Sequence, residues 1–221
     1  MQQLLVLVLG VLVTASTSAS AQQNSPNEIR TYVIDGPPPP TPPAVISRDA
    51  ERRATIRATR LTEEINLDGR LDEQVYQTVQ ALTEFIQQSP DEGAPATEKT
   101  EAWILFDDQN LHVSGRIWDS APPSEWIANE MRRDTAQLRQ NDTFALILDT
   151  FYDRRNGVAF YTNALGAIAD FALTNESNPN SDWNPVWDVR TARFEGGWTV
   201  EMEIQKAGRV MNSQETPPPS T

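Results

Sequence analysis

The sequence contains no cysteine and a single histidine, His112. Disulfides, a thiol nucleophile, cysteine-ligated zinc and iron–sulfur centres are therefore excluded, and so is a metal site built from several histidines. Any Ser–His–Asp triad would have to use His112. Positive charge is also scarce, with 18 Lys and Arg against 31 Asp and Glu and a net charge of -13. Such a chain repels phosphate backbones, so we expect no nucleic-acid partner.

Long apolar runs are equally rare, and the clearest one lies near the N-terminus. Residues 4–13 are apolar but too few to span a bilayer, which needs roughly 20 residues. Small residues follow and end in Ala19-Ser20-Ala21, an A-x-A cleavage pattern. We predict a secretory signal over residues 1–21, with a buried N-terminal strand as the alternative. An exported chain without disulfides fits the periplasm or cell surface of a bacterium.

Proline is concentrated in two segments that flank the candidate fold. Six prolines lie in residues 36–43 and three in residues 217–219. Proline runs of this kind form extended, semi-rigid spacers without a packed core. We therefore predict a disordered linker over residues 22–53, one folded domain over residues 54–205 and a disordered polar tail over residues 206–221. The abrupt tail would also suit a truncated chain.

Within residues 54–205, strand patterns recur at short spacing with turns between them. Residues 54–60 alternate apolar and polar positions, residues 143–148 form an apolar run, and Asn156-Gly157 is a turn signal after that run. Two further hairpins pair residues 101–106 with 111–118 and residues 187–194 with 198–204. Only residues 72–79 show helical spacing, with Asp72 as the expected cap. The fold class predicted is all-β: an antiparallel, jelly-roll-like β-sandwich with one short helix.

An ordered series of short motifs carries a resemblance to a known family. In order they are residues 65–73 (INLDGRLDE), 103–108 with 111–113, 141–149 (NDTFALILD), 153–170, 183–188 (WNPVWD), and 195–198 (EGGW) with Glu201. Together they resemble the family 9 carbohydrate-binding module over about residues 55–204. They are more similar still to its relatives at the N-terminus of large exported bacterial proteins, in which a membrane-associated β-barrel of unknown function follows. The resemblance implies a β-sandwich, an oligo- or polysaccharide ligand, structural calcium, no catalysis by this domain, and an outer-membrane β-barrel as partner in full-length relatives.

The resemblance also suggests which residues touch the sugar. In characterised members two tryptophans hold the sugar between them, and Asn184 with Trp187 resembles the Asn-x-x-Trp element that supplies one wall. The facing wall is either Trp118 or Trp103. Trp118, Trp183 and Trp187 lie near strand ends or in loops, where binding residues concentrate, whereas the alternation around Trp103 favours the core. The predicted carbohydrate-binding residues are Trp187, Asn184, Trp118 and Trp183.

Calcium would need six to eight oxygen ligands, and acidic residues recur at the predicted strand ends. Asp142, Asp149, Asp153 and Asp170 are the candidate ligands. The alternative is that they cap turns and keep the surface soluble, which is the commoner role of aspartate.

The leading hypothesis is non-catalytic carbohydrate binding by an exported domain. One alternative is a structural or interaction domain of a truncated membrane-associated protein that has lost its sugar site. A weaker alternative is part of a glycoside hydrolase system acting on O-glycosyl compounds in carbohydrate catabolism. Such hydrolysis needs two carboxylates about 5–10 Å apart across a cleft, and the sequence does not select a pair.

Overall fold

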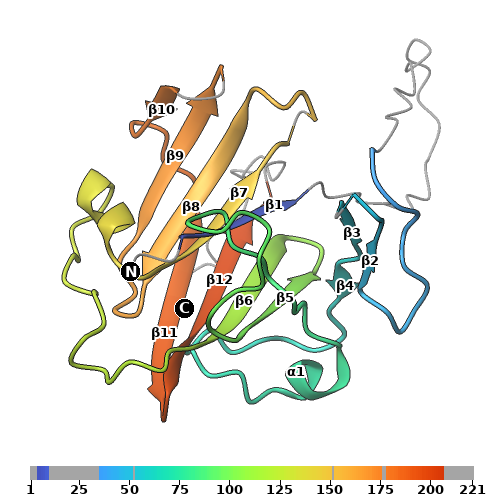
Figure 1. Cartoon of the computed structure of the whole chain (residues 1–221), viewed down its shortest axis with the longest axis horizontal. Coiled ribbons are helices and arrows are strands. Elements are labelled where there is room, and N and C mark those ends of the chain that lie inside the picture. Colours follow the sequence, from blue (N-terminus) through green and yellow to red (C-terminus); the bar gives the residue numbers. More distant parts are fainter. Residues whose placement is uncertain (1–3, 10–34, 52, 151, 176–177, 207–221) are drawn as a thin grey trace, which may run out of the picture.

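Two five-stranded sheets make up the body of the molecule (Figure 1). The computed structural model describes residues 4–9, 35–51, 53–150, 152–175 and 178–206. The first sheet has the order β1-β7-β8-β9-β10, and the second has the order β11-β12-β6-β5-β4. The predicted β-sandwich is confirmed, with α1 and a short 3-10 helix as its helical elements among the described residues.

The first sheet is antiparallel except where β1 joins it in parallel with β7. Its strands are β1 (Leu4–Leu9), β7 (Thr143–Leu148), β8 (Gly157–Asn163), β9 (Ala169–Thr174) and β10 (Asn178–Asn180). The 3-10 helix (Ala136–Gln140) precedes β7 and buries Leu138 against the apolar side chains on the outer face of this sheet.

The second sheet is antiparallel except for the short pairing of β4 with β5. Its strands are β11 (Trp187–Phe194), β12 (Gly197–Gln205), β6 (Asn110–Trp118), β5 (Thr100–Phe106) and β4 (Thr59–Arg60). A separate two-stranded sheet pairs β2 (Ile46–Arg48) with β3 (Ala54–Ile56).

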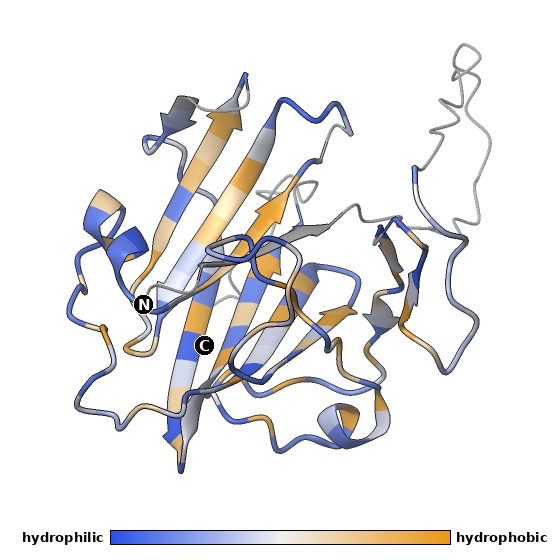
Figure 2. Cartoon of the chain, in the orientation of Figure 1, coloured by the Kyte–Doolittle hydropathy of each residue, from blue (hydrophilic) through white to orange (hydrophobic). Residues whose placement is uncertain are grey.

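The core lies between the two large sheets, because alternate residues of each strand point inward. Phe144, Leu146 and Phe160 from the first sheet meet Val200 and Met202 from the second, and all five are almost fully buried. Figure 2 shows this alternation along the strands, with the loops mainly hydrophilic. The two inner faces therefore supply the hydrophobic stabilisation of the fold.

The outer face of the second sheet is covered by the segment that contains α1 (Gln74–Thr78), which lies beside β5 in Figure 1. Glu201 of β12 is 1% exposed and accepts hydrogen bonds from the Gly69 N–H (2.8 Å) and the Tyr76 hydroxyl (2.9 Å). Gly69 has a φ of 86°, and a Cβ there would lie 2.6 Å from the carbonyl carbon of Thr191. The Asp-Gly turn of the INLDGRLDE motif is therefore hydrogen-bonded to β12 and lies against the backbone of β11.

Three local predictions differ from the structure. The strand expected over residues 54–60 is divided into β3 and β4, which belong to different sheets, because β3 pairs with β2 whereas β4 pairs with β5. The helix cap is Glu73, not Asp72, and the Glu73 side chain makes no cap bond because it accepts the Asn66 N–H.

The proline-rich segment is the third difference. Residues 35–51 were expected in a disordered linker, yet Val45 is 3% exposed in the core and Ile46 lies in β2. Asp35 forms ion pairs with Arg53 and Arg154, which fasten this segment to the sandwich. The folded domain therefore includes residues before residue 54.

Most of the residues covered by the predictions for the two chain ends lie outside the described residues. Of the predicted signal over residues 1–21, only residues 4–9 are described, as β1; the rest lies outside the described residues, as do residues 22–34 of the linker and 207–221 of the tail. No helix in the described ranges combines the length and apolar character needed to cross a membrane.

Candidate functional site

A cleft opens at the end of the sandwich where β6 ends and where β7 and β12 begin. Its volume is about 800 Å³. One wall comes from residues 86–100, which lead into β5, and the other from residues 117–127, which follow β6; we call this feature the loop cleft. The residues that line it are Ile86, Gln87, Gln88, Ser89, Pro90, Ala96, Thr97, Glu98, Thr100, Ile117, Trp118, Asp119, Ser120, Ala121, Glu125, Ile127, Asp142, Thr143, Phe144 and Trp198.

Both walls are held by local hydrogen bonds. In the first wall Ile86 pairs with Pro95, and the Gln87 side-chain amide donates to the Pro95 carbonyl at 2.8 Å. In the second wall Asp142 accepts the Ile127 N–H at 2.7 Å and returns its own N–H to the Ile127 carbonyl at 2.7 Å. The first wall is therefore held by bonds within its own loop, and the second is held to the residue before β7, as a preformed binding site requires.

The lining combines apolar and hydrogen-bonding surface. Phe144 and Trp198 are buried core residues that also reach the cleft, and Ile86 and Ile127 line it with 52% and 41% of their surface exposed. Amides, hydroxyls and carboxylates alternate with them. Ligand sites of about 300–1,000 Å³ usually have this mixture of apolar walls and a few polar groups.

The charge around the loop cleft is negative. Glu98, Asp119, Glu125 and Asp142 line it, and no Lys or Arg is among its described lining residues. Burial raises the pKa of Asp142; the Ile127 N–H lowers it, and the neighbouring Asp119 charge raises it further. The charge of Asp119 therefore acts on Asp142 within the cleft, and no described Lys or Arg of the lining neutralises it.

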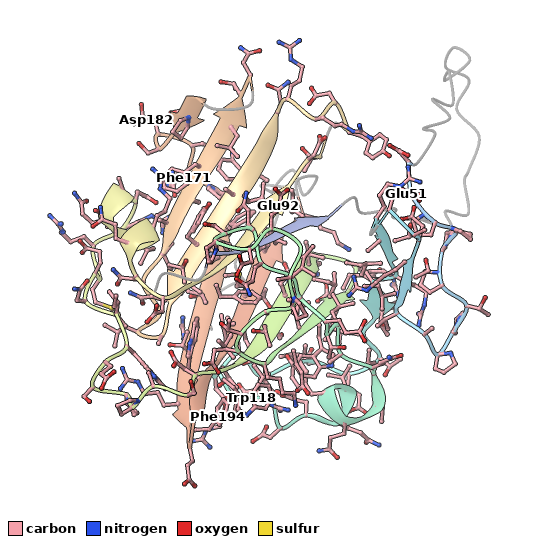
Figure 3. All side chains as sticks on the ribbon, in the orientation of Figure 1. Glu51, Glu92, Trp118, Phe171, Asp182 and Phe194 are labelled. Atoms are coloured by element: carbon pink, nitrogen blue, oxygen red, sulfur yellow. The ribbon has the colours of Figure 1, made fainter. Side chains whose placement is uncertain are left out.

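Trp118 is the one predicted sugar-binding residue that lines the loop cleft. It ends β6 and is half-buried. Its ring meets Phe194 edge to face, with centroids 5.5 Å apart, and the two lie together at one end of the second sheet (Figure 3). The Lys99 ammonium lies 4.0 Å from the ring centroid, which holds the side chain further in place.

The other three predicted sugar-binding residues form a separate group. Trp187 is only 8% exposed, donates its indole N–H to Asp170 at 2.9 Å and packs edge to face on Phe160. Trp183 is half-buried against the same phenylalanine. Asn184 is exposed and accepts a hydrogen bond from Arg133, which also pairs with Asp170. Trp187 therefore lies in the core, and the aromatic ring recorded against it among the described residues is that of Phe160, itself buried.

Neither candidate for the facing wall meets Trp187. Trp187 pairs with Ile204 and Trp118 pairs with Gly197, so seven residues of β12, or about 23 Å, separate them along the sheet. Trp103 is 3% exposed and packs on Tyr76 on the outer face of the same sheet, which confirms the expectation that it is structural. The described structure does not form the implied tryptophan pair.

The four predicted calcium ligands lie at three places. Asp142 lies in the loop cleft, and Asp170 is buried beside Trp187 and Arg133. Asp149 and Asp153 cap the loop between β7 and β8 by accepting backbone N–H groups of that loop. Among the described residues no group of three or more His, Cys, Asp or Glu is arranged to hold a metal ion. As a set, the four do not fit one calcium ion.

Asp170 has an unusual environment within this set. Its side chain is fully buried, and its Oδ1 has no hydrogen-bond partner in the described structure. Burial raises the pKa of this carboxyl, while the Trp187 indole and the Arg133 charge lower it and Asp134 raises it. The Trp187 indole N–H and the Arg133 guanidinium therefore compensate the buried negative charge, the Trp187 hydrogen bond more strongly.

The sequence pattern did not identify most of the loop cleft. Gln87, Gln88 and Glu98 lie between α1 and β5, a stretch with no periodic apolar pattern. A long connection of this kind inside a compact domain was itself a signal, because such loops are commonly functional. Asp119 and Glu125 follow β6 in the same way.

Comparison with known proteins finds no matching family model and no matching curated protein. Among solved structures, the chain is similar to a family 9 carbohydrate-binding module from Caldicellulosiruptor kristjanssonii. The structure of that module in complex with cellotriose gives a TM-score of 0.46 at 14% identity, over 68% of this chain and 67% of that one. Its structure in complex with glucose gives a TM-score of 0.45 at 16% identity, over 68% and 70%.

Proposed function

We propose that this chain is a non-catalytic carbohydrate-binding domain and that the loop cleft is its binding site. The observation that carries the proposal is the mixed lining of a cleft of about 800 Å³. Sugar rings present apolar C–H faces and a rim of hydroxyls, so they need apolar walls and hydrogen-bonding groups in the same site. Trp118, Ile86 and Ile127 supply the apolar walls, and Gln87 and Gln88 supply the hydrogen-bonding groups.

Isothermal titration with a panel of neutral oligosaccharides tests the proposal. We expect binding by the unmodified protein and a large loss of affinity in Trp118→Ala. Asn184→Ala is the matched control, because Asn184 belongs to the separate group around Trp187. Loss in Asn184→Ala with no change in Trp118→Ala would move the site to that group. Absence of binding by a folded protein would refute sugar binding altogether.

The position of Trp187 favours a second candidate function. A buried tryptophan with its N–H satisfied by Asp170 is a core residue, as expected for a structural or interaction domain without a sugar site. Under this reading, the folded protein binds none of the oligosaccharides in the panel, and Trp187→Ala lowers thermal stability.

We also propose an exported location, in the bacterial periplasm or at the cell surface. Support comes from the apolar run followed by Ala19-Ser20-Ala21. In the same setting an outer-membrane β-barrel would be a partner of the full-length protein. Expression in a bacterium followed by N-terminal sequencing of the periplasmic fraction tests the location. A mature N-terminus at Gln22 is the expected result, and such cleavage would remove β1 and leave β7 at the edge of the first sheet. An N-terminus that retains residues 4–9 would favour the alternative of an N-terminal strand.

Structural calcium is a proposal supported by the net charge of -13 and by uncompensated carboxylates such as those of the loop cleft. A bound cation would reduce their mutual repulsion and raise the melting temperature. Thermal unfolding in calcium and in EDTA measures this effect. Identical melting temperatures in both would exclude a stabilising calcium ion.

A further inference from the structure

The outer edge of β7 is the place where the first sheet depends on the predicted signal. β1 pairs with β7 in parallel along all six of its residues, and β8 occupies the other side of β7. Because β1 lies within residues 1–21, cleavage after Ala21 would remove it. The N–H and C=O groups along this edge of β7 would then lose their partners.

A bare β7 edge would favour pairing with another strand. Thr143–Leu148 (TFALIL) contains no charged residue and no proline, and Phe144, Leu146 and Leu148 belong to the core between the sheets. Natural sheets protect such an edge with charge, with proline or with a covering segment. The pairing of β1 shows that an extended strand running parallel to β7 fits there.

The chain re-enters the fold beside the same edge. Asp35 begins the second described range, donates its N–H to the Tyr152 hydroxyl at 2.7 Å and pairs with Arg154 at 2.8 Å. Tyr152 and Arg154 lie in the loop that follows β7, and β1 ends at this end of β7 too, with Leu9 opposite Leu148. A segment that leads to Asp35 along β7 would therefore run parallel to it, as β1 does.

The segment before Asp35 has the composition of a strand. Residues 29–34 read IRTYVI, which is rich in β-branched and aromatic residues, with Pro26 before them and Asp35-Gly36 as a turn signal after them. Six residues of strand span about 20 Å, the length of the six-residue β7. This segment follows Ala21, so cleavage there would retain it.

We propose that residues 29–34 replace β1 after cleavage and pair in parallel with the edge of β7. The inference rests on the proposed export and is independent of sugar binding. The hydrophobic pattern selects the register with Val33 opposite Leu148 and Ile29 opposite Phe144, because Arg30 then lies on the outer face. A shift by one residue would place Arg30 beside Phe144 in the core, where a charge is costly.

A pair of introduced cysteines tests this contact, and the sequence contains no cysteine that could interfere. In the proposed register Tyr32 lies opposite Ile147, which packs on the outer face of the first sheet, at a spacing that a disulfide tolerates. The full chain with Tyr32→Cys and Ile147→Cys is exported from a bacterium, and the periplasmic product is analysed by N-terminal sequencing and non-reducing peptide mass mapping. We expect an N-terminus at Gln22 and a disulfide within one chain.

The matched control joins Asn24→Cys with Ile147→Cys. Position 24 precedes position 32 by about 26 Å of extended chain, so this pair should form little disulfide. Equal yields from the two pairs, with an N-terminus at Gln22, would overturn the inference and leave export intact. A disulfide between two chains would assign the edge to a second copy and would also overturn it. A product that retains residues 4–9 would refute the proposed cleavage and the inference together.

Hydrogen exchange of the cleaved product gives a second measurement. The double variant Thr31→Pro, Tyr32→Pro removes one N–H that faces β7, because neighbouring N–H groups of a strand point to opposite sides. We expect the amides of residues 143–148 to exchange roughly five- to tenfold faster, as for the loss of about one hydrogen bond. Gln23→Pro, Asn24→Pro carries the same change outside the segment and should leave this rate unaltered. Equal rates in the two variants would contradict the pairing.

Discussion

Glu201 provides a sharp test of the packing on the outer face of the second sheet. Its carboxylate is 1% exposed, and burial raises its pKa from 4.5 to about 7, against the lowering effect of the Gly69 N–H and the Tyr76 hydroxyl. A folded-state pKa above the unfolded one means that the folded state binds the proton more tightly. The contribution of Glu201 to stability is therefore fully present below about pH 4.5 and is lost as the pH rises through about 7.

The size of this effect follows from the shift. A change of one pKa unit corresponds to about 1.4 kcal/mol, so a rise from 4.5 to about 7 corresponds to about 3 kcal/mol of unfolding free energy between the two ends of this pH range. Glu201→Gln fixes the neutral form. Its amide oxygen can accept the Gly69 N–H, and its NH₂ group can donate to Tyr76, whose hydroxyl then donates to Ser114.

Urea unfolding followed by tryptophan fluorescence at a series of pH values measures the effect. We expect the unmodified protein to lose stability between about pH 4.5 and 7, and Glu201→Gln to lose about 3 kcal/mol less over the same interval. Glu203→Gln is the matched control, because Glu203 is on the same strand and face but its side chain is 37% exposed. Equal pH dependence in the unmodified protein and Glu201→Gln would refute the assignment of a raised pKa to this buried carboxyl.

Three further substitutions test the packing elsewhere. Gly69→Ala should destabilise the protein by roughly 3 kcal/mol or more in urea unfolding, because the new Cβ would lie 2.6 Å from the Thr191 backbone at a φ of 86°. Gly196→Ala is the control: its φ is 84° but the space around it is open, so it should cost about 1 kcal/mol. Equal costs for the two variants would contradict the close approach at Gly69. Arg133→Ala should lower the unfolding free energy by about 1–3 kcal/mol, because it leaves buried Asp170 without its cation. Arg190→Ala is the control: it breaks only the exposed pair with Asp188 and should change the urea midpoint little. Trp103→Ala should cost about 3–5 kcal/mol in thermal unfolding, and a change below about 1 kcal/mol would place the ring outside the core.

The strands were predictable where their residues alternate over several positions. The pairs β5–β6 and β11–β12 match the predicted hairpins closely, because each strand has one buried face and a short turn. The short strands β2 and β10 were not predictable, since three residues are too few to show a period and β10 contains Pro179.

The candidate site was predictable only in part. Trp118 was identified from its place at a strand end, and it lines the loop cleft. Trp187 also lies at a strand end, but its ring packs against Phe160 in the opposite sheet. Which side of a strand end faces the core depends on how the two sheets pack, and that is decided by residues distant in sequence. The acidic character of the cleft likewise arises only when residues 98, 119, 125 and 142 are brought together.

The position of β12 has a consequence for how the chain acquires its structure. β12 is the last described strand in the sequence, yet it lies between β11 and β6 in the second sheet. Its Glu201 receives the backbone N–H of Gly69, 132 residues earlier. While the ribosome is still adding residues, β6 has no neighbour on that side and the Asp-Gly turn has no anchor, so the sandwich cannot close until synthesis has passed Glu201. If the chain crosses a membrane through a translocation pore before it folds, this strand order keeps the sandwich open until β12 has been synthesised.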